Sequence, residues 1–266
     1  MQSATLPISY AQLAFSVLLV LITGSIASLL RLGLLKSLMW GTVRTFVQLT
    51  LVGYVLTYIF KINSLWLVIA VTALMCFVAA RTAVKRTPNV PGYPTYLAFV
   101  SLLASTYLVG SIVTGLIIAP TPWYSPRIVI PIFGMLLGNS MNGIALSLDR
   151  LYGDARARAA EIEALLTFGA TPWEAVQASV REALRAGMTP TINSLMVVGI
   201  VSLPGMMTGQ ILGGADPLQA VRYQIVVMLM IAASVAIGCL LLVGSSFKRL
   251  FTEDGALQPF VLQSRK

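Results

Sequence analysis

Residues 128–148 read IVIPIFGMLLGNSMNGIALSL, a stretch without a charged side chain. A helix of about 20 apolar residues spans the hydrocarbon core of a bilayer, so this stretch is long enough to cross a membrane. Six other stretches resemble it, which gives seven predicted spans: Ile8–Leu30, Leu38–Phe60, Ile62–Ala80, Tyr96–Ala119, Ile128–Leu148, Pro190–Gly213 and Ile225–Val243. The sequence therefore predicts an all-α, polytopic helical membrane protein with about seven transmembrane helices.

The composition of the whole chain agrees with this fold class. Apolar residues make up 57% of the 266 residues and charged residues 10%, against roughly 25% charged in a typical soluble domain. This excludes disorder, a secreted disulfide scaffold and most soluble enzymes. We expect a single transmembrane domain over residues 1–266, with only the segment 149–189 long enough to fold outside the membrane.

The missing residue types exclude several kinds of chemistry. The chain has no histidine, which is the commonest metal ligand and general base. The dipeptide Gly-Lys does not occur, so there is no P-loop for ATP. No Asp or Glu lies within a predicted span, which disfavours a proton-coupled carrier. Cys76 and Cys239 lie in apolar runs and are expected to be small buried hydrophobes.

Lysine and arginine are distributed unequally among the predicted loops. Fifteen of the 18 basic residues fall in alternate loops and the C-terminal tail, counting Arg44 just inside the second predicted span, and the other loops hold three, Lys61, Arg127 and Arg222. Cytoplasmic loops of membrane proteins carry the excess of Lys and Arg. We therefore expect the N-terminus outside and the C-terminus in the cytoplasm. The net charge of +9 is then explained by the basic cytoplasmic loops, and we expect no binding of nucleic acid.

The hydrophilic segment 149–189 is predicted to form two helices joined by a turn at Gly169. Thr171-Pro172-Trp173-Glu174 is a capping box with proline at the first helical position, so a helix is expected to begin there and to end at Gly187. Thr189-Pro190 repeats the signal and is expected to begin the sixth span.

This helix–turn–helix element suits a dock for a cytoplasmic partner, as in the permeases of ATP-binding cassette (ABC) transporters. Glycine lets two backbones approach closely at the turn. A pair of amphipathic helices at the membrane surface, without a partner, is the alternative. The residues that would form the dock are Glu161, Glu163, Phe168, Gly169, Thr171, Trp173 and Glu174.

Glycines repeat every four residues in two predicted spans. Gly134 and Gly138 do so in the fifth, and Gly205, Gly209 and Gly213 in the sixth, which favours close helix packing. Pro204-Gly205 is expected to interrupt the sixth span, and interrupted helices in membranes expose backbone groups to cavities.

Polar and sulfur-bearing side chains near these stretches are candidates for a substrate path: Arg44, Gln48, Asn139, Asn142, Met206, Met207 and Gln210. Hydrogen bonding between helices is the alternative role of the asparagines, packing that of the methionines, and snorkelling to the interface that of Arg44. The sequence identifies no metal ligands.

The stretches Gly138-Asn139-Ser140-Met141-Asn142 and Leu203-Pro204-Gly205-Met206-Met207-Thr208-Gly209-Gln210 resemble the FetB-type (YbbM-like) family of ABC transporter permeases. That family includes bacterial iron export permeases and plant aluminium-tolerance permeases. The resemblance implies a half-size permease in the cell (inner or plasma) membrane, acting as a homodimer with a separate cytoplasmic ATPase subunit. That subunit would bind the ATP, so this chain is expected to be no enzyme and to hold no cofactor.

The resemblance implies that the cargo is iron exported from the cytoplasm. A hard or borderline cation usually takes carboxylate or imidazole ligands, whereas the predicted spans offer amides, hydroxyls and thioethers. A chelated or anionic metal complex would therefore fit these residues better than a bare ion. A secondary carrier or channel, an ABC permease for a nucleotide sugar, and a membrane scaffold without transport are the alternatives.

Overall fold

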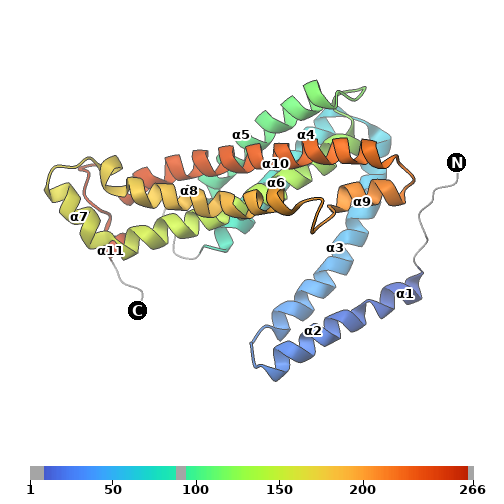
Figure 1. Cartoon of the computed structure of the whole chain (residues 1–266), viewed down its shortest axis with the longest axis horizontal. Helices are drawn as coiled ribbons and strands as arrows, with labels where there is room; N and C mark the ends of the chain where they lie inside the picture. Colours follow the sequence, from blue (N-terminus) through green and yellow to red (C-terminus); the bar gives the residue numbers. More distant parts are fainter. Residues whose placement is uncertain (1–8, 88–93, 263–266) are drawn as a thin grey trace.

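The computed structural model describes residues 9–87 and 94–262, and nearly all regular structure in these ranges is helical (Figure 1). The expected start of the first span at Ile8 and the basic residues Arg265 and Lys266 lie outside the described residues. In chain order the helices are α1 (Tyr10–Phe15), α2 (Val17–Leu29), α3 (Leu35–Ile62), α4 (Leu65–Lys85), α5 (Pro94–Ile112) with a π-helical turn (Val113–Ile117), α6 (Pro126–Ala157), α7 (Ala159–Thr167), α8 (Pro172–Val197), α9 (Gly205–Leu212), α10 (Pro217–Ser246) with a 3-10 turn (Phe247–Leu250), and α11 (Pro259–Leu262).

Helix α6 is the centre of a bundle that also contains α4, α5, α8 and α10 (Figure 1). The side chains of Leu136, Ile144 and Leu148 on α6 are 0% exposed. A buried hydroxyl pair joins α6 to α10, with Ser140 Oγ 3.0 Å from Ser234 Oγ. Because hydroxyls in an apolar core need partners, this pair also fixes how the two helices face each other.

Six helical segments in the described part of the chain are long and apolar enough to cross a membrane, against seven predicted spans. The predicted span Pro190–Gly213 has no continuous counterpart, because helix α8 stops at Val197 and α9 begins at Gly205. In Figure 1, α8 and α9 together lead from the α7 end of the bundle to the start of α10 at the opposite end. The all-α membrane fold is therefore confirmed, but the predicted sixth span is interrupted between α8 and α9.

Helix α8 also differs from the expected boundary between a cytoplasmic helix and a span. The helix was expected to end at Gly187 and a new one to begin at Thr189-Pro190, yet α8 runs through both without a break. Gly187 is buried, and a Cβ added there would lie 2.7 Å from the carbonyl oxygen of Gly143 on α6 and 2.9 Å from Cys239 Sγ on α10. Tertiary packing of this kind overrides the weak local preference of glycine against helix.

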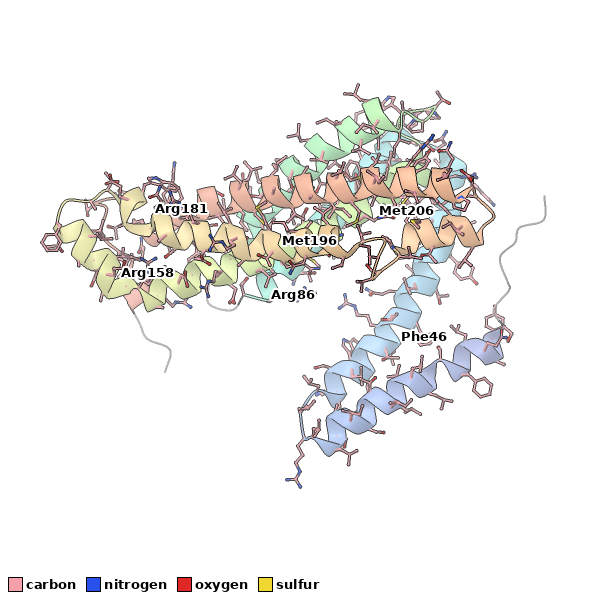
Figure 2. The ribbon with its side chains drawn as sticks, viewed as in Figure 1. Phe46, Arg86, Arg158, Arg181, Met196 and Met206 are labelled. Atoms are coloured by element: carbon pink, nitrogen blue, oxygen red, sulfur yellow. The ribbon has the colours of Figure 1, made fainter. Side chains whose placement is uncertain are left out.

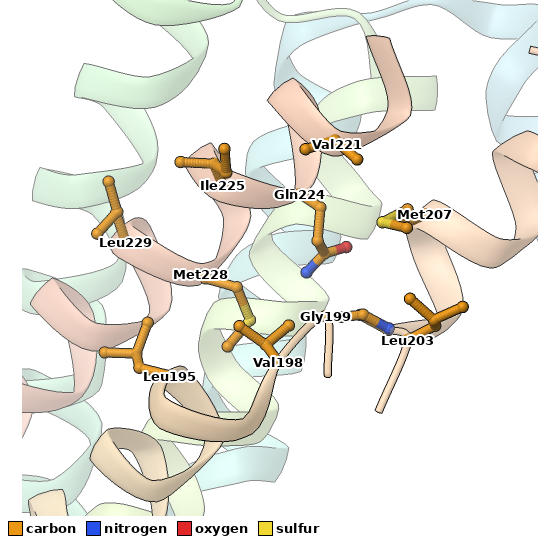
Figure 3. A pocket seen from close by; sticks show the side chains of 11 residues that line it. Leu195, Val198, Gly199, Leu203, Met207, Val221, Gln224, Ile225, Met228 and Leu229 are labelled. Atoms are coloured by element: carbon orange, nitrogen blue, oxygen red, sulfur yellow. The ribbon is translucent and has the colours of Figure 1, made fainter. Parts of the chain in front are cut away.

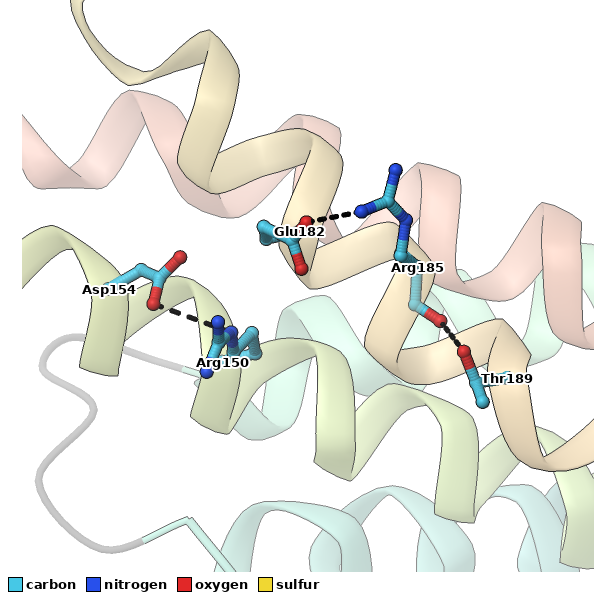
Figure 4. Close-up of polar contacts among 5 residues, drawn as sticks. All are labelled: Arg150, Asp154, Glu182, Arg185 and Thr189. Atoms are coloured by element: carbon cyan, nitrogen blue, oxygen red, sulfur yellow. Dashed lines mark hydrogen bonds and ion pairs between the residues drawn. The ribbon is translucent and has the colours of Figure 1, made fainter.

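Charged pairs mark the end of the bundle nearest α7. On α6, Arg150 lies 3.4 Å from Asp154, and on α8, Arg185 lies 2.6 Å from Glu182 (Figure 4). The Thr189 hydroxyl donates a 2.7 Å hydrogen bond to the carbonyl oxygen of Arg185. Charges of this density do not sit in hydrocarbon, so α6 and α8 extend past the apolar part of the bundle at this end.

The α2–α3 hairpin lies apart from the bundle (Figure 1). Its two helices pack closely at Gly24, where an added Cβ would lie 3.3 Å from Leu35 Cδ1. Helix α3 reaches the bundle near its C-terminal end, at the buried Ile59. Most of the apolar surface of this hairpin is therefore exposed in a single copy of the chain.

Candidate functional site

Many of the predicted functional residues lie in two regions at opposite ends of α8. One is the interruption between α8 and α9, and the other is the turn between α7 and α8. Figure 2 shows Arg158 and Arg181 at the α7 end and Met206 beyond the interruption. Helix α8 is thus the element that joins the two regions.

The interruption is a short loop, residues 198–204, that closes on itself. The Gly199 amide donates a 2.9 Å hydrogen bond to the carbonyl oxygen of Ser202, and Gly199 has a φ of +84°. The loop leaves Ile200 and Val201 89% and 79% exposed. The expected interruption beside Pro204 is therefore present, and it begins earlier in the chain, at Val198.

Two cavities flank this loop and share Val198, Pro204 and Met228 in their walls. The smaller one, of about 220 Å³, is lined by the polar side chains of Asn139, Thr191, Ser194 and Ser202. The larger one, of about 350 Å³, is lined mainly by apolar side chains and includes Met207 (Figure 3). The structure therefore brings Asn139 and Met207 to the same interruption, on separate cavities.

The other candidates for a substrate path lie elsewhere. Asn142 accepts a 2.7 Å hydrogen bond from Nη1 of Arg86, the residue after the end of α4, and Met206 packs against the apolar core. Gln210 Oε1 is buried and has no hydrogen-bond partner among the described residues. Arg44 and Gln48 are exposed on α3, in the hairpin that stands apart from the bundle. The structure does not bring all seven predicted residues into one path.

The predicted packing glycines are not where neighbouring helices of this chain approach most closely. At Gly138, Gly205, Gly209 and Gly213, an added Cβ would meet no atom of another helix within 4 Å. Gly134 would meet only the end of the Met75 side chain, at an ordinary 3.4 Å.

Among the glycines of α6 and α8, the close contacts lie instead at Gly143 and Gly187. A Cβ on Gly143 would lie 2.8 Å from Val235 Cγ1, and one on Gly187 would overlap Ser147 Oγ. Gly143 and Ser147 are small residues four positions apart, a spacing that favours helix packing and was available in the sequence. Within one copy of the chain, α6 therefore packs most closely on α8 and α10 through Gly143 and Ser147, and Gly134 and Gly138 make no comparably close contact.

At the other end of α8, the predicted helix–turn–helix element is confirmed. Helix α7 ends at Thr167, and the chain turns through Gly169, whose φ of +89° is a left-handed conformation that favours glycine. The Phe168 side chain at the tip of this turn is 89% exposed. A large apolar side chain presented to solvent on a tight turn is suited to contact with another protein.

Hydrogen bonds fix both flanks of this turn. Thr171 and Glu174 form the predicted capping box, with Glu174 Oε2 accepting a 2.8 Å bond from the Thr171 amide. These bonds hold the pKa of Glu174 below its usual range, first through the Thr171 hydroxyl and then through the Thr171 amide. Arg158 lies 2.6 Å from Glu161, and its hydrogen bond lowers the pKa of that carboxyl.

A carboxylate whose pKa is lower in the folded state stabilises that state above its unfolded pKa. The contribution is lost as the pH falls through the folded value. The α7–α8 turn is therefore at its full stability at neutral pH and weakens under acid conditions.

Replacing Thr171 with alanine is expected to loosen the first turn of α8, because the side-chain cap on the Glu174 amide is lost. Loss of such a cap costs about 1 kcal/mol, or roughly fivefold in a local opening equilibrium. Hydrogen exchange of the amides at residues 173–175 should accelerate by that factor at neutral pH. Thr171→Ser keeps the hydroxyl and is the control. Equal exchange in the wild type and in Thr171→Ala would contradict the role of the cap.

A C-terminal hairpin braces this element, which the sequence analysis did not predict. Phe251 and Leu257 pair across a short antiparallel bridge, and both are buried in the same cluster as Ile162 of α7 and Val176 of α8. The Trp173 ring lies edge-on to Phe247, 5.2 Å between centroids. Trp173 therefore packs partly inward, while the exposed side of the dock is formed by Phe168.

Glu163 lies on the rim of a groove between α7 and this hairpin. The groove has a volume of about 560 Å³, and Asp254 also lines it. No group of three or more His, Cys, Asp or Glu side chains close enough to hold a metal ion occurs in the part of the chain that the structure describes.

Comparison with known proteins assigns the chain to a family. The model of the uncharacterised protein family UPF0014 matches residues 10–251. The chain belongs to this family. The UPF0014 match includes both the interruption between α8 and α9 and the turn between α7 and α8.

Several UPF0014 relatives align over most of their length. The "UPF0014 membrane protein slr1647" of Synechocystis sp. is 39% identical, over 85% of this chain and 87% of that protein. The "Probable iron export permease protein FetB" of Escherichia coli is 34% identical, over 92% and 93%. The "Protein ALUMINUM SENSITIVE 3" of Arabidopsis thaliana is 36% identical, over 88% and 84%. No solved structure matches the chain.

The family assignment and the structure agree on location. UPF0014 relatives are named as membrane proteins, and six helical segments of the described chain can span a bilayer. This UPF0014 protein is therefore a multi-pass membrane protein.

Proposed function

We propose that this UPF0014 protein is the permease subunit of an ABC transporter that exports iron, or a metal complex, from the cytoplasm. A separate ATPase subunit would bind and hydrolyse ATP, so this chain would itself be no enzyme. The relative FetB, 34% identical over nearly the whole chain, is named as a probable iron export permease, which supports the transport role and the cargo.

The exposed turn between α7 and α8 is the main support for a partner subunit. Phe168 projects 89% exposed from a turn that Gly169 and the Thr171 cap hold in one conformation. The C-terminal hairpin packs against α7 and α8 behind the turn, so a partner that binds the turn could move these helices as one unit. A rigid apolar knob of this kind fits a groove on another protein, which we infer to be the ATPase. Because an ATPase acts from the cytoplasm, this proposal also places the α7 end inside and the N-terminus outside.

Helix α8 gives a physical route from that dock to the interruption. It has 26 residues without a break, or roughly 39 Å at 1.5 Å per residue. A displacement applied at Thr171 would therefore move the wall of both cavities at Val198. The loop after α8 can absorb the movement, because Gly199 and its exposed neighbours are packed against little else.

The polar cavity beside this loop is the proposed contact for cargo. It presents one carboxamide, from Asn139, and the hydroxyls of Thr191, Ser194 and Ser202. Uncharged oxygen donors are weak ligands for a bare hard cation but can hydrogen-bond to the ligands of a metal complex. The chemistry of this cavity therefore favours a complexed metal over a naked ion.

The α2–α3 hairpin supports a homodimer. Arg44 and Gln48 are exposed on α3, within a helix otherwise long and apolar enough to span the bilayer. A charged side chain facing lipid is costly, and such residues almost always face protein or a water-filled cavity. Phe46, Val47 and Leu51 on α3 line a shallow apolar groove, into which we infer that a second copy packs.

The deciding experiment tests whether flux requires the ATPase. The chain would be produced in iron-loaded cells together with a candidate ABC ATPase subunit, and iron efflux would be measured. We expect efflux to fall at least tenfold when the P-loop lysine of the ATPase is replaced with alanine. Efflux that persists without an active ATPase would identify a carrier or channel instead, and no efflux in any combination would reject iron as cargo.

A further inference from the structure

The larger cavity beside the interruption has features that the proposed metal cargo does not explain. It lies between the end of α8, the start of α9 and the first turns of α10, and has a volume of about 350 Å³ (Figure 3). Leu195, Val221, Ile225 and Leu229 supply much of its wall. None of the described residues that line it is charged.

One polar side chain, Gln224 of α10, points into this apolar cavity. Gln224 is 6% exposed, and its Oε1 has no hydrogen-bond partner in the described part of the chain. In Figure 3 its carboxamide lies between the Met207 and Met228 side chains. A buried amide oxygen without a partner is unfavourable, so a hydrogen-bond donor placed in this cavity would be stabilised.

We propose that this cavity is a binding site for an uncharged aromatic molecule with one hydrogen-bond donor. Gln224 Oε1 would accept the hydrogen bond from that donor. The thioethers of Met207 and Met228 favour an aromatic ring, because sulfur–aromatic contacts are attractive. An ion is disfavoured, since burying a charge without a counter-charge is far more costly than burying a neutral group. The volume lies in the range of pockets that hold small organic ligands.

The site goes beyond the proposed cargo and is linked to it through α8. Leu195 and Val198 lie at the end of the helix that begins at the proposed dock, so a bound molecule would restrain that end of α8. This consequence for transport rests on the proposed function. The binding itself does not, and it can be measured without any ATPase.

The experiment measures binding of a matched pair of probes to the full-length protein in lipid nanodiscs. Radiolabelled 1-naphthol is an uncharged aromatic with one O–H donor, and 1-methoxynaphthalene is nearly the same shape without a donor. Equilibrium dialysis would compare both probes, with empty nanodiscs subtracted. We expect the wild type to bind 1-naphthol about tenfold more tightly than the methoxy probe, in line with one buried hydrogen bond.

Two variants test the assignment of residues. Gln224→Leu keeps the approximate size of the side chain, removes a buried unpaired amide and is expected to fold; it should lose the tenfold preference and bind both probes alike. Val198→Trp fills the cavity from its rim and should lose both probes. No saturable binding by the wild type, or an unchanged preference in Gln224→Leu, would overturn the proposal, whatever the outcome of the efflux experiment.

Discussion

Replacing Gly169 with valine is expected to reduce ATP-driven efflux more than tenfold while the protein still inserts and folds. Gly169 has a φ of +89°, where a β-branched residue is strained. Such strain costs about 1–3 kcal/mol, or a factor of about 5 to 150 in the equilibrium between the native turn and a rearranged one. Because an added Cβ would meet no atom within 4 Å, the effect arises from the backbone and not from a clash.

A rearranged turn would displace Phe168, just before Gly169, and Thr171, two residues after it, from the surface proposed to meet the ATPase. The measurements are co-purification of the ATPase with the tagged chain and efflux from the same cells. Gly153→Val is the matched control, because Gly153 is an exposed helical residue of α6 whose added Cβ also meets nothing. Normal co-purification and efflux in Gly169→Val would mean that the partner docks elsewhere.

Local signals in the sequence were sufficient for this turn. Thr171, Pro172 and Glu174 specify the start of α8 through contacts within four residues, and Gly169 supplies the conformation that the turn needs. Such features depend on neighbouring residues alone, so one sequence reveals them. The functional meaning of the turn stays a prediction, because it depends on a partner that lies outside this chain.

The end of the same helix shows where local reasoning fails. Gly187 was expected to end one helix and Thr189-Pro190 to begin the next, yet α8 continues through both because Gly187 packs against α6 and α10. The four-residue glycine spacing at Gly134 and Gly138 was likewise assigned to packing, whereas the tertiary structure uses Gly143. Spacing indicates that a helix can pack closely, but not which of its faces meets a neighbour.

The C-terminal hairpin and Gln224 were missed for different reasons. Leu250, Phe251 and Leu257 are buried against α7 and α8, but they are too few for a periodic pattern. Gln224 is one amide in an apolar helix, and only the cavity beside it distinguishes it from other polar residues of the spans. Both features depend on contacts between segments that are far apart in the chain, which the sequence pattern alone does not reveal.

Replacing Gly187 with alanine is expected to destabilise the folded protein by about 3 kcal/mol, the upper end of the range for an overpacked core. The added Cβ would overlap Ser147 Oγ and lie 2.7 Å from the carbonyl oxygen of Gly143, which cannot move without shifting α6. The apparent melting temperature of the purified protein should fall by about 10 °C, because 1 kcal/mol shifts it by roughly 2–4 °C at this size.

Gly138→Ala is the same glycine-to-alanine substitution, but it is not expected to destabilise the protein. An added Cβ at Gly138 meets nothing within 4 Å, and alanine is favoured over glycine in a helix by about 1 kcal/mol. Its melting temperature should therefore stay level or rise slightly, whereas that of Gly187→Ala falls. Both values would be read from size-exclusion traces after heating. If instead the melting temperature of Gly138→Ala fell and that of Gly187→Ala did not change, α6 would pack closely through Gly134 and Gly138. Helix α8 would then not be held firmly against the core, and it could not act as a rigid link between the dock and the cavities.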